Sequence, residues 1–108
     1  MAQPILVLVR DLMFASKISA TAQAMQVAVK LIRDPEKLAA EPGEKVIVDL
    51  NQPGALEAAA NWKALTHGRA IGFVSHVDRD TIALAESMGI DQILPRSQFV
   101  QKLVEILT

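Results

Sequence analysis

Cysteine is absent from this chain of 108 residues, tyrosine is absent too, and the aromatic residues are one tryptophan and three phenylalanines. Without cysteine the chain has no disulfide, no thiolate metal ligand and no thiol nucleophile. A chain without disulfides is typical of a reducing compartment, so we expect the cytoplasm. The scarcity of aromatic rings also leaves few side chains on which a planar ligand can stack.

A strong net charge is also lacking, because 11 lysines and arginines oppose 12 acidic residues and give a formal charge of -1. The basic residues are scattered and form no stripe, so we expect no nucleic-acid partner. The apolar run at residues 5–9 is too short for a membrane span or a signal-peptide core, and Arg10 and Asp11 follow it at once. We therefore expect no membrane association.

Apolar residues are abundant, at 51% of the chain, and the length suits one domain over residues 1–108. Short apolar runs alternate with segments of helical periodicity, which predicts an α/β fold with a parallel sheet and helices on both faces. The predicted strands are residues 5–9, 27–32, 45–49, 69–74 and 91–94. The predicted helices follow Asp11, begin at Pro35, cover 55–65 and 78–88, and follow Ser97.

Several single residues predict local features. Asp11 and Ser97 are expected as helix N-caps, and Trp62 as a core residue because it shares a helical face with apolar neighbours. Gly72, inside a predicted strand, indicates a close backbone approach or a tightly packed helix. Lys30 marks its strand as an edge. The last helix is expected to turn four side chains inward: Val100, Leu103, Val104 and Leu107.

Asp49 closes the β-branched run Val46-Ile47-Val48, directly before a turn that contains Pro53 and Gly54. In an open parallel sheet, ligand and reaction sites lie beyond the carboxyl ends of the strands. Asp49 is therefore the first candidate for chemistry. The structural alternative is that it only ends the strand and begins the turn. His67 and His76 have no clustered metal ligands and are expected as loop residues.

Residues 49–54, Asp-Leu-Asn-Gln-Pro-Gly, resemble the receiver domains of two-component response regulators, of the chemotaxis-regulator type. In that family the run is the phospho-acceptor aspartate, Leu, two variable residues, Pro and Gly. The resemblance covers essentially the whole chain and includes the approach to the last strand at residues 89–94. It implies a flavodoxin-like, doubly wound, five-stranded parallel sheet with strand order 2-1-3-4-5. It places Asp49 at the acceptor position and Ser75 at the position that contacts the phosphoryl group.

Two family positions differ here. The acid pair that holds Mg²⁺ in the family corresponds to Val9 and Arg10, with Asp11 one residue further on. Asp49 and Asp11 are thus the candidate metal ligands, next to an Arg10 guanidinium that repels a divalent cation. The family's Lys-Pro after the last strand corresponds to Arg96 and Ser97. Arg96 keeps the charge but presents a planar fork that binds a carboxylate in two places.

The resemblance and the departures together predict a stand-alone, divergent receiver-like module that is not an enzyme. We expect it to act by binding a protein, either a histidine kinase or a downstream signalling protein, and to need no cofactor. Arg10 or Arg96 is expected to form an ion pair with Asp49, so that the module is independent of phosphorylation or weakly phosphorylated.

Three alternatives remain open. The first is a phosphorylatable single-domain response regulator that uses Asp49, Asp11 and Mg²⁺. The second is a flavodoxin-like cofactor-binding protein or small enzyme. The latter requires a Ser-, Thr- or Gly-rich phosphate loop after the first strand, where residues 10–13 are Arg-Asp-Leu-Met. A homodimer through the last strand and helix is the third, suggested by apolar Phe99, Val100 and Val104.

Overall fold

The computed structural model describes residues 3–75 and 77–108, so the loop residue His76 lies outside the described residues. Strands and helices alternate along the chain, as the apolar runs predict. The strands are β1 (Ile5–Leu8), β2 (Val29–Ile32), β3 (Lys45–Asp49), β4 (Arg69–Val74) and β5 (Gln92–Pro95). The helices are α1 (Leu12–Ala24), the 3-10 helix η1 (Pro35–Ala40), α2 (Ala55–Thr66), α3 (Arg79–Ser87), α4 (Arg96–Gln101) and α5 (Leu103–Leu107).

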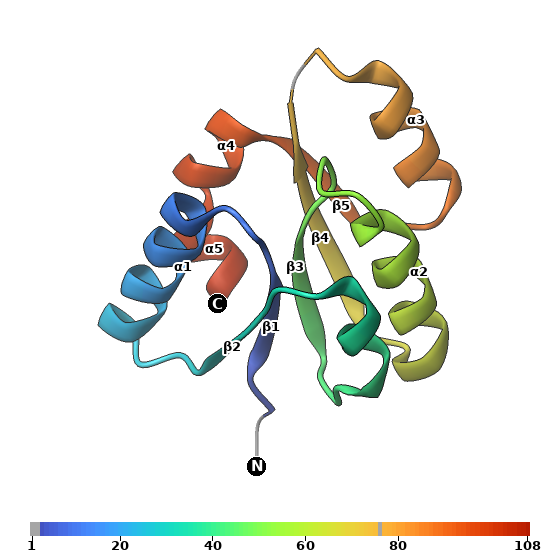
Figure 1. Cartoon of the computed structure of the whole chain (residues 1–108). Helices are drawn as coiled ribbons and strands as arrows, with labels where there is room; N and C mark the ends of the chain where they lie inside the picture. Colours follow the sequence, from blue (N-terminus) through green and yellow to red (C-terminus); the bar gives the residue numbers. More distant parts are fainter. Residues whose placement is uncertain (1–2, 76) are drawn as a thin grey trace.

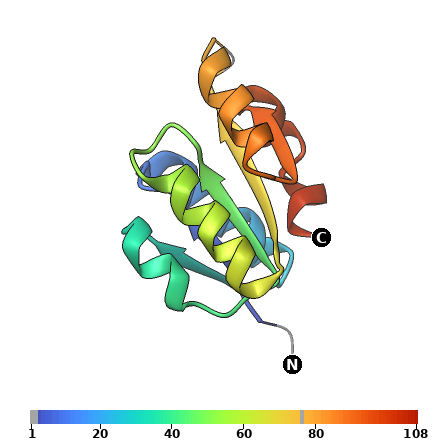
Figure 2. The ribbon, with the colours of Figure 1, turned by 90° about the vertical axis from the view of Figure 1, so that its right-hand side faces the viewer.

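The five strands form one parallel sheet in the order β2-β1-β3-β4-β5. Helices α1, α4 and α5 cover one face, and η1, α2 and α3 cover the other (Figure 1). Figure 2 shows η1, α2 and α3 in front of the sheet. This is the predicted flavodoxin-like, doubly wound arrangement. Among the described residues, no helix combines the length and apolar character that a membrane span requires.

Two hydrophobic cores lie on the two faces of the sheet, because side chains of a strand point alternately to either side. Leu6 and Leu8 of β1 belong to the core under η1, α2 and α3, whereas Val7 belongs to the core under α1, α4 and α5. Trp62 of α2 is fully buried, as predicted, and its indole N–H donates to the carbonyl of Glu41 at 3.0 Å.

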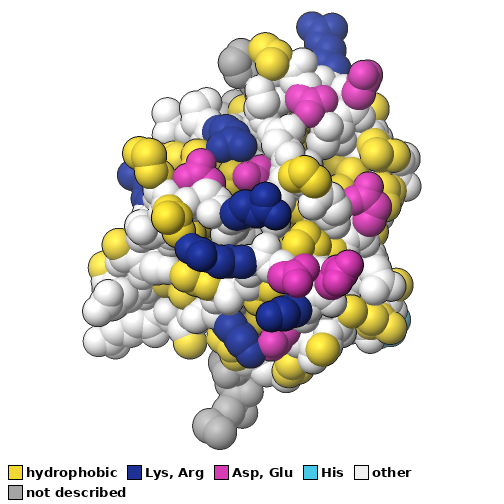
Figure 3. All heavy atoms as spheres, in the orientation of Figure 1, with side chains coloured by type: hydrophobic (Ala, Val, Ile, Leu, Met, Phe, Trp, Pro, Cys, Tyr) yellow, Lys and Arg dark blue, Asp and Glu magenta, His cyan; other side chains and the backbone are white. Residues whose placement is uncertain are grey.

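The predicted edge strand is confirmed. β2 is at one end of the sheet, and the Lys30 side chain on it is exposed and forms an ion pair with Glu41 at 2.7 Å. Charged side chains on an edge strand discourage pairing with another chain. In the view of Figure 3, basic and acidic side chains are interspersed, which agrees with the scattered charges of the sequence.

The close approach at Gly72 is also confirmed, but its cause is a loop side chain and not a helix. A Cβ atom added at Gly72 would lie 2.6 Å from Cδ1 and 2.7 Å from Cγ of Leu50. Leu50 directly follows β3 and is buried over β4. Glycine at position 72 therefore makes room for the residue that follows Asp49.

The C-terminal helix differs from the prediction. It is interrupted at Lys102, which separates α4 from α5, and it begins at Arg96, so Ser97 lies inside the helix and is not its N-cap. Leu103, Ile106 and Leu107 are buried, whereas Val104 is 57% exposed. The prediction that Val104 points inward is wrong because the buried stripe runs through Phe99, Leu103 and Ile106, and Val104 lies to one side of it. Phe99 is fully buried, so it adds nothing to the apolar surface expected for a homodimer.

Candidate functional site

Asp49 ends β3, which lies between β1 and β4 in the middle of the sheet. Its residue surface is 6% exposed, and it is one of two buried polar residues among those described. The chain turns immediately after it, since the backbone N–H of Gln52 donates to the carbonyl of Asp49 at 3.1 Å. The same turn brings the Asn51 N–H to Asp49 Oδ1 at 3.0 Å. The carboxylate is therefore fixed at the carboxyl edge of the sheet.

Arg96 contacts this carboxylate from the first residue of α4. Its Nη2 atom lies 3.4 Å from Oδ1 and 3.5 Å from Oδ2 of Asp49. The guanidinium carbon also lies 5.1 Å from the ring centroid of Phe14 and 5.4 Å from that of Phe73. A guanidinium at these distances is attracted by the aromatic ring faces, which hold it beside Asp49. The predicted ion pair thus forms with Arg96.

Arg10 does not take part in that ion pair. It is exposed at the end of β1, and its contact with the site is through its backbone N–H, which donates to Gln52 Oε1 at 3.1 Å. The ion pairs of the described residues do not include the Arg10 side chain. The expectation for the positive partner of Asp49 therefore holds for Arg96 alone.

Burial raises the pKa of Asp49, because a carboxylate that loses water favours its neutral form. The hydrogen bond from the Asn51 backbone and the charge of Arg96 both lower this pKa, and the negative charge of Asp11 raises it. The net direction is upward, so burial and Asp11 outweigh the compensating groups. Asp49 is thus an ionisable group whose pKa is shifted by its surroundings, and such shifts are common at functional sites.

Asp11 caps α1, as predicted. Its Oδ1 accepts from the backbone N–H of Met13 at 2.9 Å and from that of Phe14 at 3.3 Å. Before it, Val9 is 1% exposed and belongs to the core. The position that would supply the first acid of a metal site is therefore filled by a packed aliphatic side chain.

The side chains of Val9, Asp11 and Asp49 do not fit Mg²⁺, which requires several oxygen ligands in near-octahedral geometry. Both oxygens of Asp49 face the Arg96 guanidinium, and Asp11 Oδ1 is engaged by two amides. The described residues contain no group of three or more His, Cys, Asp or Glu side chains placed to hold a metal. The chemistry that the site offers is therefore that of a carboxylate neutralised by a guanidinium.

Gln52 is a site residue that the sequence reasoning missed. Its side chain is buried, accepts from the backbone N–H of Arg10 and donates from Nε2 to the carbonyl of Arg33 at 3.1 Å. The amide thus joins the loops that follow β1, β2 and β3. Gln52 stands at a variable position of the family run, so no local signal distinguishes it.

Asn51 connects the same turn to the loop after β4. Its Oδ1 accepts from the backbone N–H of Ser75 at 2.8 Å, and its Nδ2 donates to Asp78 Oδ2 at 2.8 Å. Asp78 is the N-cap of α3. Ser75 is thus brought next to the Asp49 turn through its backbone. Among the described residues, no hydrogen bond joins its hydroxyl group to Asp49.

The aromatic rings lie mostly out of reach of a ligand. Trp62, Phe73 and Phe99 are fully buried, and the three phenylalanines pack together, with centroids 4.9 Å apart for Phe14 and Phe73 and 4.6 Å apart for Phe73 and Phe99. A stacked flavin requires exposed rings beside the site. These positions give the flavodoxin-like alternative no support.

No protein-family model matches the sequence, and no curated protein matches it. Solved structures share the fold. The BeF3-activated receiver domain of DrrB from Thermotoga maritima aligns with a TM-score of 0.81 and 19% identity over 97% of this chain and 93% of that one. The phosphorylated cyanobacterial phytochrome response regulator RcpA aligns with a TM-score of 0.82 and 16% identity over 98% and 91%.

A third structure, a response regulator from Burkholderia pseudomallei with a phosphorylated aspartic acid, calcium ion and citrate, aligns with a TM-score of 0.79 and 20% identity. The alignment covers 98% of this chain and 66% of that chain. At such low sequence identities, structural similarity establishes the fold alone. The chain therefore has the fold of a response-regulator receiver domain.

Proposed function

We propose that this chain is a receiver-like signalling module that acts by binding another protein, without depending on phosphorylation of Asp49. Its partner is a histidine kinase or a downstream signalling protein, and its place of action is the cytoplasm. The fold supports this proposal, since the solved structures that share it are response regulators and their receiver domains. No enzymatic step is assigned to the chain.

The contact between Arg96 and Asp49 is the observation on which the proposal depends. Phosphoryl transfer to a carboxylate requires a free nucleophile and positive charge that stabilises the transferred group. Here the positive charge of Arg96 already compensates the nucleophile at 3.4 Å. The guanidinium therefore compensates the negative charge of Asp49 from within the chain, without a metal ion or a phosphoryl group.

The test is intact-mass analysis after incubation of the full chain with a small-molecule phosphodonor and Mg²⁺. We expect the mass of the protein to stay unchanged over the time in which a phosphorylatable receiver domain is modified. Asp49→Asn is the matched control, because it removes the nucleophile and keeps the side-chain volume. Rapid, stoichiometric phosphorylation that disappears in Asp49→Asn would overturn the proposal.

That second outcome would establish the alternative of a phosphorylatable response regulator. One observation favours it: the negative charge of Asp11 contributes to the raised pKa of Asp49, after the larger effect of burial. Mg²⁺ is commonly bound in proteins through one or two carboxylates together with phosphate oxygens. Loss of phosphorylation in Asp11→Asn, as well as in Asp49→Asn, would assign Asp11 its part in that site.

A further inference from the structure

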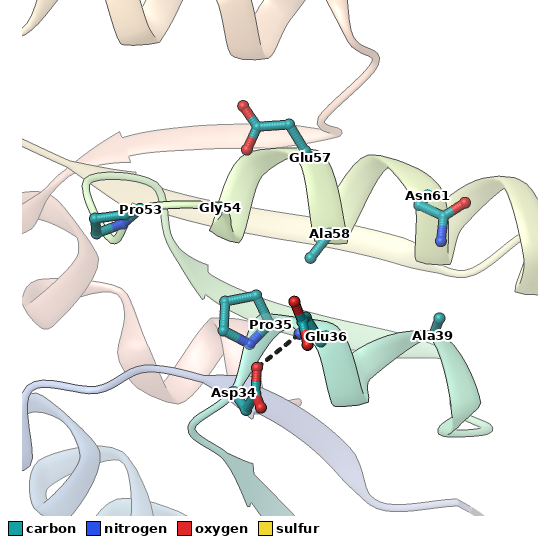
Figure 4. A pocket seen from close by; sticks show the side chains of 9 residues that line it. All are labelled: Asp34, Pro35, Glu36, Ala39, Pro53, Gly54, Glu57, Ala58 and Asn61. Carbon is teal, nitrogen blue, oxygen red and sulfur yellow. Dashed lines mark hydrogen bonds between the residues drawn. The ribbon is translucent and has the colours of Figure 1, made fainter.

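An open groove of about 440 Å³ lies on the surface where η1 packs against α2, on the face of the sheet opposite Arg96. Figure 4 shows its walls: Ala39 and Pro35 of η1 point toward α2, and Ala58 of α2 points toward η1. Pro53 and Gly54, which precede α2, line one end. The walls of this surface groove are therefore made mainly of small or rigid side chains.

The 3-10 geometry of η1 contributes to this surface groove. The helix has six residues, and its single buried side chain is Leu38. In a 3-10 helix residues three positions apart are eclipsed, so one side chain directed at the core leaves the flanking positions turned outward. Ala39 and Glu36 are accordingly exposed. The groove is thus an open surface next to a well-packed core.

The charge of the groove has one sign. Asp34, Glu36 and Glu57 are among its lining residues, and no lysine or arginine is. In Figure 4 the Glu57 carboxylate points away from η1, and Asp34 accepts the hydrogen bond from the Glu36 N–H, so these acids lie at the rim. An apolar floor with an acidic rim matches the aliphatic stem and charged head of lysine or arginine.

We infer that this groove is a docking site for a protein segment in which lysine or arginine alternates with small apolar residues. The inference rests on the proposed function, because it identifies one surface through which a protein partner is recognised. Charge complementarity favours this occupant, since three carboxylates with no lining cation repel an acidic segment. The small walls favour alanine or glycine between the basic residues.

The groove is continuous with the Asp49 turn. Gln52 hydrogen-bonds the carbonyl of Arg33, directly before Asp34, while Pro53 and Gly54 follow Gln52 into the groove. The buried Gln52 side chain thus joins the segments that lead into the two walls. A segment that binds here contacts the same turn that positions the Asp49 carboxylate.

The test is a titration of the ¹⁵N-labelled full chain with a blocked peptide of alternating alanine and arginine, followed by NMR. We expect the backbone amides of Ala39, Gly54 and Ala58 to shift together and to saturate. A peptide of alternating alanine and glutamate is expected to cause no shifts at these amides. Equal shifts with both peptides, or shifts that spread over every acidic surface, would overturn the inference.

Variants then separate the groove from general acidity. Replacement of both Glu36 and Glu57 by glutamine is expected to weaken binding about tenfold, because two charge contacts are lost. Replacement of Glu86 and Glu105, which are exposed acids on α3 and α5, by glutamine is the matched control and should leave the affinity unchanged. Equal weakening by the two pairs would refute a specific site.

A steric pair gives an independent readout. Ala39→Met fills the groove and is expected to abolish the shifts, whereas Ala64→Met, at an exposed position of α2 outside the groove, is expected to preserve them. Unchanged binding by Ala39→Met would refute the site. A chain that fails this titration but stays unmodified at Asp49 in the phosphodonor experiment refutes the docking site and leaves the proposed function in place.

Discussion

The Arg96 guanidinium lies over the ring of Phe14, at 5.1 Å from the centroid, while its Nη2 atom contacts Asp49. Phe14 belongs to the first turn of α1 and Arg96 to the first turn of α4. The contact therefore connects two helices on one face of the sheet through the candidate site. It also gives Arg96 a hydrophobic support that a flexible surface arginine lacks.

Replacement of this arginine is expected to destabilise the fold modestly. Arg96→Gln removes the ion pair and the contact with the rings, and its expected cost is about 1 kcal/mol of unfolding free energy, since the side chain is one-third exposed and partly screened by water. Arg96→Lys keeps the charge but lacks the planar group, so its unfolding free energy should lie between those of the parent protein and Arg96→Gln. Urea denaturation at neutral pH measures both.

Arg10→Gln is the matched control for that series. Arg10 is exposed, so its loss is expected to change the unfolding free energy by less than about 0.5 kcal/mol. A larger effect for Arg10→Gln than for Arg96→Gln would show that Arg10 is the main partner of Asp49 in solution.

Asp49→Asn is expected to change how stability depends on pH. The folded-state pKa of Asp49 is raised above its ordinary value of 3.8, chiefly by burial, so the folded protein keeps this proton at pH values where the unfolded chain has lost it. The stability of the parent protein should therefore fall as pH rises from 3.8 through the raised pKa. The asparagine variant lacks this loss.

The measurement is the difference in unfolding free energy between Asp49→Asn and the parent chain across that pH range. The variant should gain stability relative to the parent as pH rises, and the difference should become constant above the folded-state pKa. A difference that moves in the opposite direction would mean that Arg96 stabilises the carboxylate more than burial destabilises it.

Gln52→Ala is expected to cost about 2 kcal/mol, because it leaves the Arg10 N–H and the Arg33 carbonyl without their side-chain partner. Gln98→Ala, at an exposed position of α4, should change stability by less than about 0.5 kcal/mol. Chemical denaturation measures both variants. Equal stability of the two would show that water replaces the Gln52 amide without cost.

Gly72→Ala is expected to destabilise by about 2 kcal/mol, since its Cβ would lie 2.6 Å from Leu50 Cδ1. The clash should be relieved when Leu50 is shortened. In a double-mutant cycle, Gly72→Ala is therefore expected to cost at least about 1 kcal/mol less in the Leu50→Ala background. Additive costs would show that the strand adapts by another route.

Sequence alone predicted the elements that depend on local pattern. The apolar runs indicated five strands, their alternation with helices indicated a parallel sheet, and the run from Asp49 to Gly54 indicated the strand end where the candidate site lies. Asp11 was predicted as a cap because an N-cap acts on backbone amides two and three residues away. Each of these features involves residues that are close along the chain.

Tertiary structure decided the contacts between residues that are distant along the chain. It selected Arg96, 47 positions from Asp49, rather than Arg10, and it gave Gln52 its two backbone partners. It also buried Phe99, Leu103 and Ile106 of the last two helices and left Val104 exposed. Such choices follow from which side chains fill the space left by the others, and packing of this kind has no period that a sequence displays.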